Sequence, residues 1–299
     1  MTGIFEAEPR PDAIDRVAGL PHSELVRRYI RPMRPVIVTD AIGHWRALRR
    51  WTPELFRDEY GSTEVVVDQK THALRDYINA LLAATPEAPA PYMRNVLLDK
   101  WLPELMADIS PLPRCITPNW LDSRVFPARE SMRTLEIYIG GAGARFPILH
   151  YDGFHTHAWL MQICGTKRYV VYPPDQTELL YPRTGIEVNK SSISDLANPD
   201  LERFPLFARA TPTVFDLRPG ETLFVPSRWW HTVKILSTSI TISVNSANGP
   251  NWSAFVRDFI ESRRSYRSPF MLALLQAYMV AMGWGEAAIA ELTGWSKML

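Results

Sequence analysis

The chain has 299 residues, of which 46% are hydrophobic and 22% charged, and its formal net charge is +1. This length supports one large domain with a sizeable core, or one domain with a small appendage. The near balance of 33 Lys and Arg residues against 32 Asp and Glu residues leaves no basic excess, so we expect no nucleic-acid partner.

Targeting and redox signals point to the cell interior. The only cysteines, Cys115 and Cys164, are too few for a disulfide scaffold. Residues 1–8 lack a basic region followed by an apolar core, so no secretory signal is expected. No apolar run is expected to reach membrane-spanning length. These features predict a soluble, cytoplasmic enzyme with no membrane partner.

The N-terminal third predicts mixed helices and strands. Residues 34–39 and 64–68 have the composition of strands. Thr52 is expected to cap a helix that runs toward Gly61, with a proline in its first turn. Residues 74–82 show helical apolar spacing, and the Pro/Ala-rich stretch 85–91 predicts a loop.

The middle of the chain predicts a barrel of antiparallel strands. From residue 135 to 244, short β-rich runs alternate with Gly and Pro. Residues 140–143 read Gly-Gly-Ala-Gly but lack the Lys-Ser/Thr of a phosphate loop, so they predict a turn. The runs 158–163 and 169–174 flank a Gly-containing turn and predict a hairpin, with Lys167 at the start of its second strand.

Beyond Asn245 the pattern becomes helical, with segments at 252–262, 270–282 and 286–292. Such helices cannot bury an apolar stripe alone, so they either pack on the barrel or form a dimer interface. We therefore expect three regions. These are 1–130 with N-terminal helices and strands, 131–249 with the barrel, and 250–299 with a helical segment for dimerisation.

Residues 150–152 read His-Tyr-Asp, and His231 follows on a distant expected strand. Side chains two residues apart leave the same face of a strand, so His150 and Asp152 are expected to reach one ion from a single short strand. Two imidazoles and one carboxylate form the facial triad of non-haem Fe(II) oxygenases, which leaves positions open for a co-substrate and dioxygen. The same donors also suit Zn, Mn or Co, so iron is an inference.

Two alternatives remain open for these motifs. A His-x-Asp triplet arises easily by chance, and its histidine is then an ordinary surface or core residue. A second pair, His155 and His157, offers a rival three-histidine site with His231, although such a pair more often lies in a loop that faces substrate or solvent. Lys167 either points into the barrel and pairs with the distal carboxylate of a dicarboxylate, or is a solvated turn lysine.

Further motifs accompany the triad in a set order. They lie at 162–168 (Gln-Ile-Cys-Gly-Thr-Lys-Arg), 173–176 (Pro-Pro-Asp-Gln), 180–182 (Leu-Tyr-Pro), 198–205 (Asn-Pro-Asp-Leu-Glu-Arg-Phe-Pro), 219–226 (Pro-Gly-Glu-Thr-Leu-Phe-Val-Pro) and 240–245 (Ile-Thr-Ile-Ser-Val-Asn). Together they resemble the JmjC/cupin-8 family of 2-oxoglutarate-dependent oxygenases. Within it, the chain is most similar to asparaginyl hydroxylases of the factor-inhibiting-HIF type.

The resemblance implies a mainly β fold with flanking helices. Its core is a double-stranded β-helix (jelly roll) with N-terminal α/β elements and C-terminal helices. The resemblance also implies Fe(II) as the metal, 2-oxoglutarate as the co-substrate and O₂ as the oxidant. His150, Asp152 and His231 are then the iron ligands and catalytic residues.

The remaining expected site residues bind the co-substrate. By resemblance, Lys167 binds the 5-carboxylate of 2-oxoglutarate, and Asn245 and Tyr92 lie beside the same molecule. Between Asp152 and Gln162 the chain is longer than these relatives by about two residues, so the substrate-side wall is expected to differ. The C-terminal helices imply a homodimer.

The implied reaction hydroxylates a C–H bond, with a protein or peptide side chain as the favoured substrate, and releases succinate and CO₂. A small metabolite, a natural product or an N-methyl group is an alternative substrate for the same chemistry. A cupin with other metal chemistry would instead predict no dependence on 2-oxoglutarate. A non-catalytic binding module is disfavoured, because a buried charge cluster without its metal only costs stability.

Overall fold

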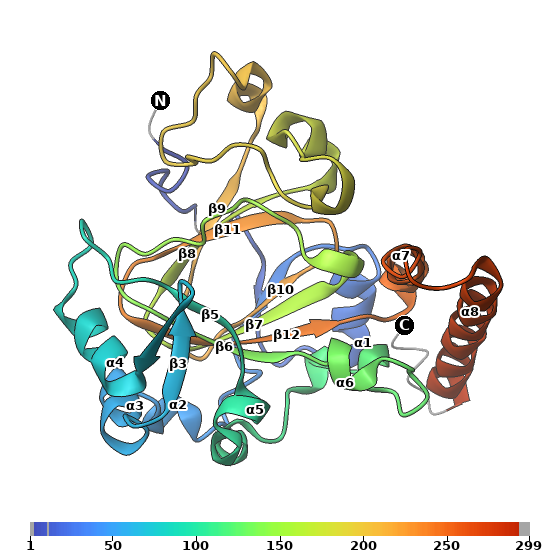
Figure 1. Cartoon of the computed structure of the whole chain (residues 1–299), viewed down its shortest axis with the longest axis horizontal. Coiled ribbons are helices and arrows are strands. Elements are labelled where there is room, and N and C mark those ends of the chain that lie inside the picture. Colours follow the sequence, from blue (N-terminus) through green and yellow to red (C-terminus); the bar gives the residue numbers. More distant parts are fainter. Residues whose placement is uncertain (1–2, 11, 293–299) are drawn as a thin grey trace.

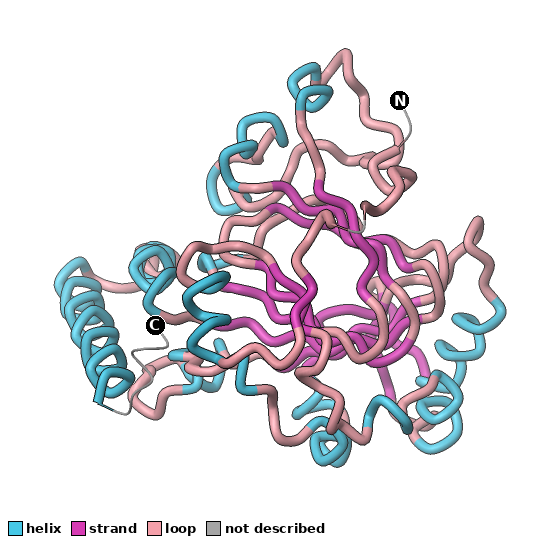
Figure 2. The backbone as a smooth tube through the Cα atoms, turned by 180° about the vertical axis from the view of Figure 1, so that it is seen from behind, coloured by secondary structure: helices cyan, strands magenta, loops and turns pink. Residues whose placement is uncertain are grey.

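Two β-sheets face each other at the centre of the computed structural model, and helices lie around them (Figure 1). The structure describes residues 3–10 and 12–292. From behind, the strands gather around the middle of the molecule while most helices occupy its periphery (Figure 2). The predicted mainly β fold, a jelly-roll core with flanking helices, is confirmed.

The larger sheet has seven strands in the order β1-β2-β10-β7-β12-β6-β5. Only β1 and β2 are parallel, and the other neighbours run antiparallel. The strands are β1 (Arg16–Val17), β2 (Val36–Val38), β5 (Met93–Leu97), β6 (Leu135–Gly140), β7 (His157–Cys164), β10 (Thr222–Val225) and β12 (Ser239–Ser246). Because β1, β2 and β5 come from the region 1–130, this sheet joins residues from both sides of position 130.

The smaller sheet has three antiparallel strands in the order β11-β8-β9. They are β8 (Lys167–Tyr172), β9 (Thr213–Leu217) and β11 (Trp230–Ile235). A separate hairpin pairs β3 (Glu64–Val67) with β4 (Lys70–Ala73). The strands predicted over 34–39 and 64–68 are thus confirmed as β2 and β3.

The predicted hairpin on either side of Gly165 is wrong. Both runs form strands, but β7 pairs with β10 and β12, whereas β8 pairs with β9 and β11. Gly165 has a φ of +68°, and a Cβ there would lie 2.0 Å from the carbonyl oxygen of Thr238. Glycine permits this tight crossing, and the chain passes from one sheet to the other as in a jelly roll.

Alternate residues of the larger sheet face opposite sides. In β6, Leu135, Ile137 and Ile139 belong to the main apolar core. Glu136 and Tyr138, on the other face of the same strand, line the cavity between the sheets. Alternation of side chains along a strand produces this pattern. The sheet therefore has an apolar outer face and a more polar inner face.

Short helices from the N-terminal region contribute to the core on the outer face of the larger sheet. They are α1 (His22–Leu25) with its π-helical continuation η1 (Val26–Ile30), α2 (Ala47–Arg50), α3 (Pro53–Glu59), α4 (Leu74–Ala83) and α5 (Leu98–Trp101). A further short helix, α6 (Arg129–Met132), packs through Met132 on the separate apolar cluster around α7. The predicted cap of α3 is confirmed, because the Leu55 N–H donates to Thr52 Oγ1 at 3.2 Å. In α4, one side is buried in the core, as its apolar spacing predicted.

Short 3-10 turns connect many of these elements. They are η2 (Pro103–Ile109), η3 (Arg114–Ile116), η4 (Trp120–Asp122), η5 (Gly153–His155), η6 (Pro174–Leu180), η7 (Gly185–Glu187) and η8 (Pro205–Arg209). The turn η5 follows directly on the predicted ligand Asp152, which makes it the one closest to the site.

The C-terminal region forms two helices, α7 (Gly249–Glu261) and α8 (Pro269–Leu292). The prediction of separate helices at 270–282 and 286–292 is wrong, because α8 runs through both. Gly283 lies where α8 packs against α7, and a Cβ there would stand 2.5 Å from the ring of Trp252. This glycine therefore permits close helix packing and does not end the helix.

The prediction that no apolar run reaches membrane-spanning length also needs correction. Pro269–Ile289 of α8 is long and apolar enough to cross a bilayer by length and composition alone. Only 22% of the apolar stretch in this helix is buried. Phe270, Leu274 and Trp284 are exposed on this helix. One such helix does not by itself indicate a membrane protein, because a helix that packs on a partner has a similar composition. The homodimer through these helices stays a prediction.

Candidate metal centre

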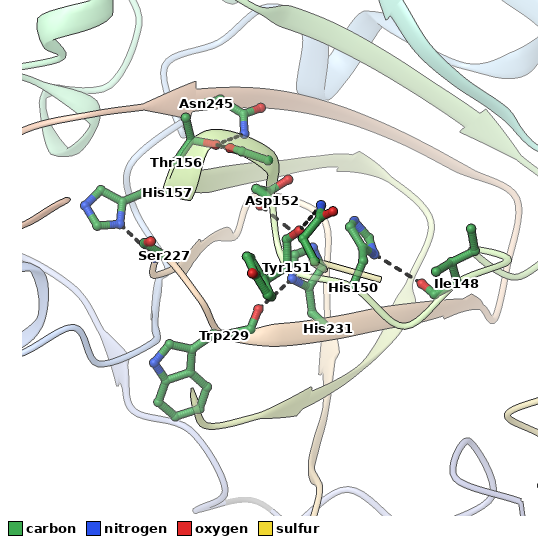
Figure 3. A network of polar contacts seen from close by, with 12 residues as sticks. Ile148, His150, Tyr151, Asp152, Thr156, His157, Ser227, Trp229, His231 and Asn245 are labelled. Carbon is green, nitrogen blue, oxygen red and sulfur yellow. Dashed lines mark hydrogen bonds and ion pairs between the residues drawn. The ribbon is translucent and has the colours of Figure 1, made fainter. Parts of the chain in front are cut away.

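Three side chains with metal-binding atoms converge where the chain at His150 meets β11 (Figure 3). The His150 N–H donates to the His231 carbonyl at 3.1 Å, and the His231 N–H donates to the His150 carbonyl at 2.6 Å. This backbone bridge sets the two imidazoles side by side, with ring centroids 4.4 Å apart. One ligand atom from each of His150, Asp152 and His231 lies within 4.8 Å of the others. The structure thus brings the three predicted ligands together.

The expected single strand for His150 and Asp152 is not observed. His150 forms isolated bridges to His231 and Lys190, and Asp152 directly precedes the turn η5. Asp152 nevertheless has an extended backbone, with φ −63° and ψ 141°. The two side chains still reach one space, because an extended chain alternates its side chains with or without a regular ladder.

Backbone carbonyls orient both imidazoles. Nδ1 of His150 lies 3.1 Å from the carbonyl oxygen of Ile148, and Nδ1 of His231 lies 3.0 Å from that of Trp229. A carbonyl only accepts, so in each ring Nδ1 carries the proton and Nε2 keeps a free lone pair. Nε2 of His231 stands 3.9 Å from Oδ2 of Asp152. This arrangement of a metal-facing nitrogen and a carbonyl-bound nitrogen is typical of metal-ligating histidines.

Burial acts oppositely on two of the ligands, since it favours the neutral form of His150 and disfavours the ionised form of Asp152. Desolvation, reinforced by the nearby His231, lowers the pKa of His150 to about 3, so its imidazole is neutral. Burial raises the pKa of Asp152, while His231 and a side-chain hydrogen bond from Asn245 oppose that rise. A buried carboxylate is costly unless a positive charge lies beside it. A divalent cation would supply that charge.

Asn245, on β12, lies beside Asp152 and is held by two hydroxyl groups, of which Figure 3 shows that of Thr156. Its Nδ2 donates to Thr156 Oγ1 at 2.9 Å, and its Oδ1 accepts from the Thr134 hydroxyl at 3.2 Å. Asn245 was predicted near the co-substrate. It lines the same cavity as the triad, on the wall next to Asp152.

Lys167 and Tyr92 form the second polar group of the cavity. The Lys167 side chain is 1% exposed, and its Nζ donates to the Tyr92 hydroxyl at 2.7 Å. Nζ also lies 5.2 Å from the ring centroid of Tyr92 and 5.7 Å from that of Tyr138. Burial lowers the pKa of Lys167 to about 7. No carboxylate of the described residues forms an ion pair with Lys167, so this ammonium suits a bound anion.

All six predicted site residues line one cavity of about 130 Å³ between the two sheets. That volume admits a small molecule or one side chain rather than a folded element. Sequence reasoning did not assign the other lining residues to the site, among them Glu136, Tyr138 and Phe146. Glu136 and Tyr138 are signalled by the alternation within 135–139, where they stand between Leu and Ile residues. No local signal marks Phe146.

Phe146 covers one side of the centre. Its ring stacks on His150, with centroids 4.5 Å apart and an interplanar angle of 17°. The guanidinium of Arg94, a residue of β5, lies 5.2 Å from the Phe146 ring centroid. The stacking of Phe146 on His150 restricts the orientation of the imidazole.

The rival three-histidine site receives no support. The Ser227 N–H donates to Nδ1 of His157 at 3.0 Å, and Nε2 of His157 lies 3.2 Å from Asn248 Oδ1. Both nitrogens of this buried ring are therefore engaged. His155 points to α7, with its Nδ1 2.5 Å from Oδ2 of Asp258. Among the side chains described in residues 3–10 and 12–289, the group of three or more His, Cys, Asp or Glu residues close enough to share an ion is the predicted triad.

Comparison with protein families identifies one domain over most of the chain. A family model described as a cupin-like domain matches residues 21–247. That match contains every strand of both sheets except β1, together with the triad, Lys167 and Tyr92, and it ends just before α7. The two C-terminal helices lie outside it.

Curated proteins similar to the chain include two demethylases. The Lysine-specific demethylase 8 of Xenopus tropicalis is 29% identical over 226 residues, which cover 72% of this chain and 48% of that protein. The Arginine-specific demethylase JMJ20 of Arabidopsis thaliana is 27% identical over 292 residues, which cover 84% of this chain and 62% of that protein.

A third similar protein carries no reaction in its name. The HSPB1-associated protein 1 of Rattus norvegicus is 40% identical over 124 residues, which cover 40% of this chain and 25% of that protein. The chain thus spans less than two thirds of the length of each of these relatives.

Proposed function

This chain belongs to the cupin-like domain family, and we propose that it is an Fe(II)- and 2-oxoglutarate-dependent oxygenase. One observation carries the proposal. A single cavity holds a triad of two imidazoles and a carboxylate, together with a buried lysine that has no anionic partner among the described residues. The first group suits a divalent cation, and the second suits the far carboxylate of a dicarboxylate.

The donor set fits Fe(II). Imidazole and carboxylate ligands suit iron better than a thiolate set would, and three protein ligands leave positions open for a bidentate co-substrate and dioxygen. His150, Asp152 and His231 would hold the ion. With 2-oxoglutarate bound, iron supplies the oxidising power that hydroxylates a C–H bond, with succinate and CO₂ as the other products.

Lys167 and Tyr92 would anchor the co-substrate. The Lys167 ammonium would bind the 5-carboxylate by a charge-assisted hydrogen bond, and the Tyr92 hydroxyl would add a neutral one. A carboxylate next to Lys167 favours its protonated form, which offsets the effect of burial on its pKa. The pair thus sets the orientation of the molecule in the cavity.

The surrounding residues would hold the ligands in place. The carbonyl groups of Ile148 and Trp229 keep Nε2 of each histidine available, and Asn245 supports the Asp152 carboxylate. Phe146 and Leu160 add apolar surface to the cavity, which limits access of water to the reacting groups.

For the substrate, we propose a protein or peptide side chain. Hydroxylation of an ordinary carbon would leave a stable alcohol, whereas hydroxylation of an N-methyl carbon gives a hemiaminal that releases formaldehyde. The resemblance to asparaginyl hydroxylases supports the first outcome, and the names of two similar proteins support the second. A small metabolite is the alternative substrate, and it would enter the same cavity.

Succinate formation tests the proposal. Purified protein with Fe(II), ascorbate and O₂ should convert 2-oxoglutarate to succinate slowly even without its substrate. His231→Ala and Asp152→Ala should abolish this turnover, because each removes a metal ligand. His72→Ala, at a half-exposed position on β4 that does not line the cavity, serves as the matched control and should keep it. Absence of succinate from the wild type, together with absence of 2-oxoglutarate binding to its Mn(II) form, would refute the proposal.

A further inference from the structure

The cavity contains a second charged group that lacks a counter-ion. Glu136, on β6, is half-buried and lines the cavity with the triad. Its carboxylate accepts a hydrogen bond from the Tyr138 hydroxyl at 2.6 Å. No lysine, arginine or histidine of the described residues forms an ion pair with it. A half-buried carboxylate with one neutral partner is costly unless a cation joins it.

The two charges that would neutralise each other are kept apart. Lys167 shares the cavity with Glu136, yet its ammonium bonds to Tyr92 and not to this carboxylate. Tyr138 stands between the two groups, because its hydroxyl bonds Glu136 while its ring faces Lys167 Nζ at 5.7 Å. The cavity thus presents one cationic subsite and one separate anionic subsite.

No neighbouring residue in the described part of the chain neutralises the Glu136 carboxylate. Burial is the main cause that raises the pKa of Glu136, and the negative charge of Asp152 adds to the effect. Across the ladder, Glu136 pairs with Ser243 on β12 and with Leu97 on β5, neither of which carries a charge. A bound metal neutralises Asp152, and 2-oxoglutarate occupies Lys167. Glu136 then remains the unmatched charge.

The place of Glu136 fits contact with an incoming side chain. Asn95, which also lines the cavity, is exposed and lies in a bulge of β5 where its φ is +58°. Asn95 and Glu136 thus line the same cavity from the neighbouring strands β5 and β6. A side chain that enters beside the exposed Asn95 would share this cavity with the Glu136 carboxylate and the triad.

We propose that Glu136 is a specificity-determining residue that binds the ammonium or guanidinium group of the substrate side chain. The inference rests on the proposed function for the place of the substrate, and it adds the substrate's charge. A lysine-like or arginine-like side chain would satisfy Glu136, whereas a neutral asparagine amide would leave the carboxylate without a counter-charge. The cavity thus selects cationic over neutral side chains.

Two small probes of equal shape test this charge preference. N-acetyl-arginine amide carries a guanidinium, and N-acetyl-citrulline amide carries a neutral urea in its place. Each is titrated into the Mn(II)-loaded protein with 2-oxoglutarate, and paramagnetic broadening of its side-chain protons by the bound Mn(II) gives Kd without any turnover. The wild type should prefer the arginine probe by roughly tenfold or more, as expected for a hydrogen bond to a charged group.

Variants of Glu136 test whether its carboxylate causes the preference for the arginine probe. Glu136→Gln keeps the shape and removes the charge, so the two probes should bind within about twofold of each other, while Glu136→Asp should restore part of the preference. Glu178→Gln, which makes the same change at an exposed position, should retain the full preference. Thermal melting shows that each variant is folded, and Glu136→Ala replaces the Gln variant if that one fails to fold.

The outcomes separate this inference from the proposed function. Equal binding of both probes to the wild type, or an undiminished preference in Glu136→Gln, would overturn the inference. Succinate formation by the wild type without a cationic preference would contradict the inference alone. A preference that depends on Glu136 in a protein that forms no succinate would support the subsite and contradict the oxygenase.

Discussion

The two faces of the larger sheet are built from the same strands but have opposite chemistry. Its outer face presents Ile137, Ile242 and Met161, each fully buried in the main core. Its inner face presents Glu136, Ser243 and Leu160 from the same three strands, and these line the cavity. Side-chain alternation makes this division possible.

The comparison shows how the fold separates stability from chemistry. Apolar burial on the outer face supplies stabilisation that does not depend on a ligand. The inner face carries groups whose charges are unmatched in the described structure, and such groups cost stability until a ligand binds. Changes on the outer face should therefore act on folding, and changes on the inner face on binding.

The largest effect is expected on the outer face. Ile137→Ala removes a fully buried side chain from the core, which should lower the free energy of unfolding by about 2–5 kcal/mol. The KM for 2-oxoglutarate of the folded fraction should not change. Chemical denaturation and steady-state kinetics measure the two quantities. Val66→Ala, at a side chain that is 60% exposed, should change stability by less than about 0.5 kcal/mol. A large change in KM for Ile137→Ala would contradict the claim that outer-face residues affect folding and not binding.

Lys167→Met should act on binding. The variant keeps an apolar stem of similar length and removes the ammonium, so KM for 2-oxoglutarate should rise by roughly a hundredfold, as expected when one partner of a buried charge pair is lost. Loss of a buried, unpaired charge should at the same time leave the protein at least as stable. Lys100→Met, at an exposed position on α5, is the matched control. An unchanged KM would remove Lys167 from the co-substrate site.

Asn245→Ala should weaken the metal site. Asn245 supports Asp152 and is itself fixed by Thr156 and Thr134, so its loss should lower metal affinity by roughly tenfold. Competition between the protein and a chelator for Mn(II) measures this affinity. Asn198→Ala, at an exposed position, should have no effect. If the two variants bind Mn(II) equally well, Asn245 does not support the ligand set.

The smallest expected effect is a pH dependence. Burial lowers the pKa of Lys167 to about 7, so the free enzyme loses the ammonium as pH rises through that value. KM for 2-oxoglutarate should therefore increase above pH 7, by at most about tenfold per pH unit. Lys167→Arg, whose guanidinium stays charged, should flatten the profile. A wild-type KM that falls with rising pH would contradict the assigned charge.

Several elements were predictable because their signals are local. The cap of α3 depends on Thr52 and the proline after it, and β2 and β3 follow from short apolar runs. The ligand spacing of His150 and Asp152 needs only an extended chain, which explains why the triad converges even though the expected strand is absent. The donor atoms, two imidazole nitrogens and a carboxylate oxygen, follow from the residue types alone.

Other features depend on distant partners. The hairpin prediction failed because the turn at Gly165 leaves open which strands β7 and β8 pair with. The two-helix prediction failed because Gly283 contacts Trp252, a residue of another helix. His157 was a rival ligand in the sequence, and only its contacts with Ser227 and Asn248 remove it from consideration.

The sequence by itself determined the residue types of the metal triad and the alternation of apolar and polar residues in β6, because each depends on neighbours within a few residues. It left open whether Lys167 is buried. The tertiary structure decided that Lys167 faces Tyr92, that Glu136 has no counter-charge and that both share one cavity with the triad. These relations join residues far apart in the chain. They depend on which strands pair and which way each strand faces, and a single sequence does not specify either.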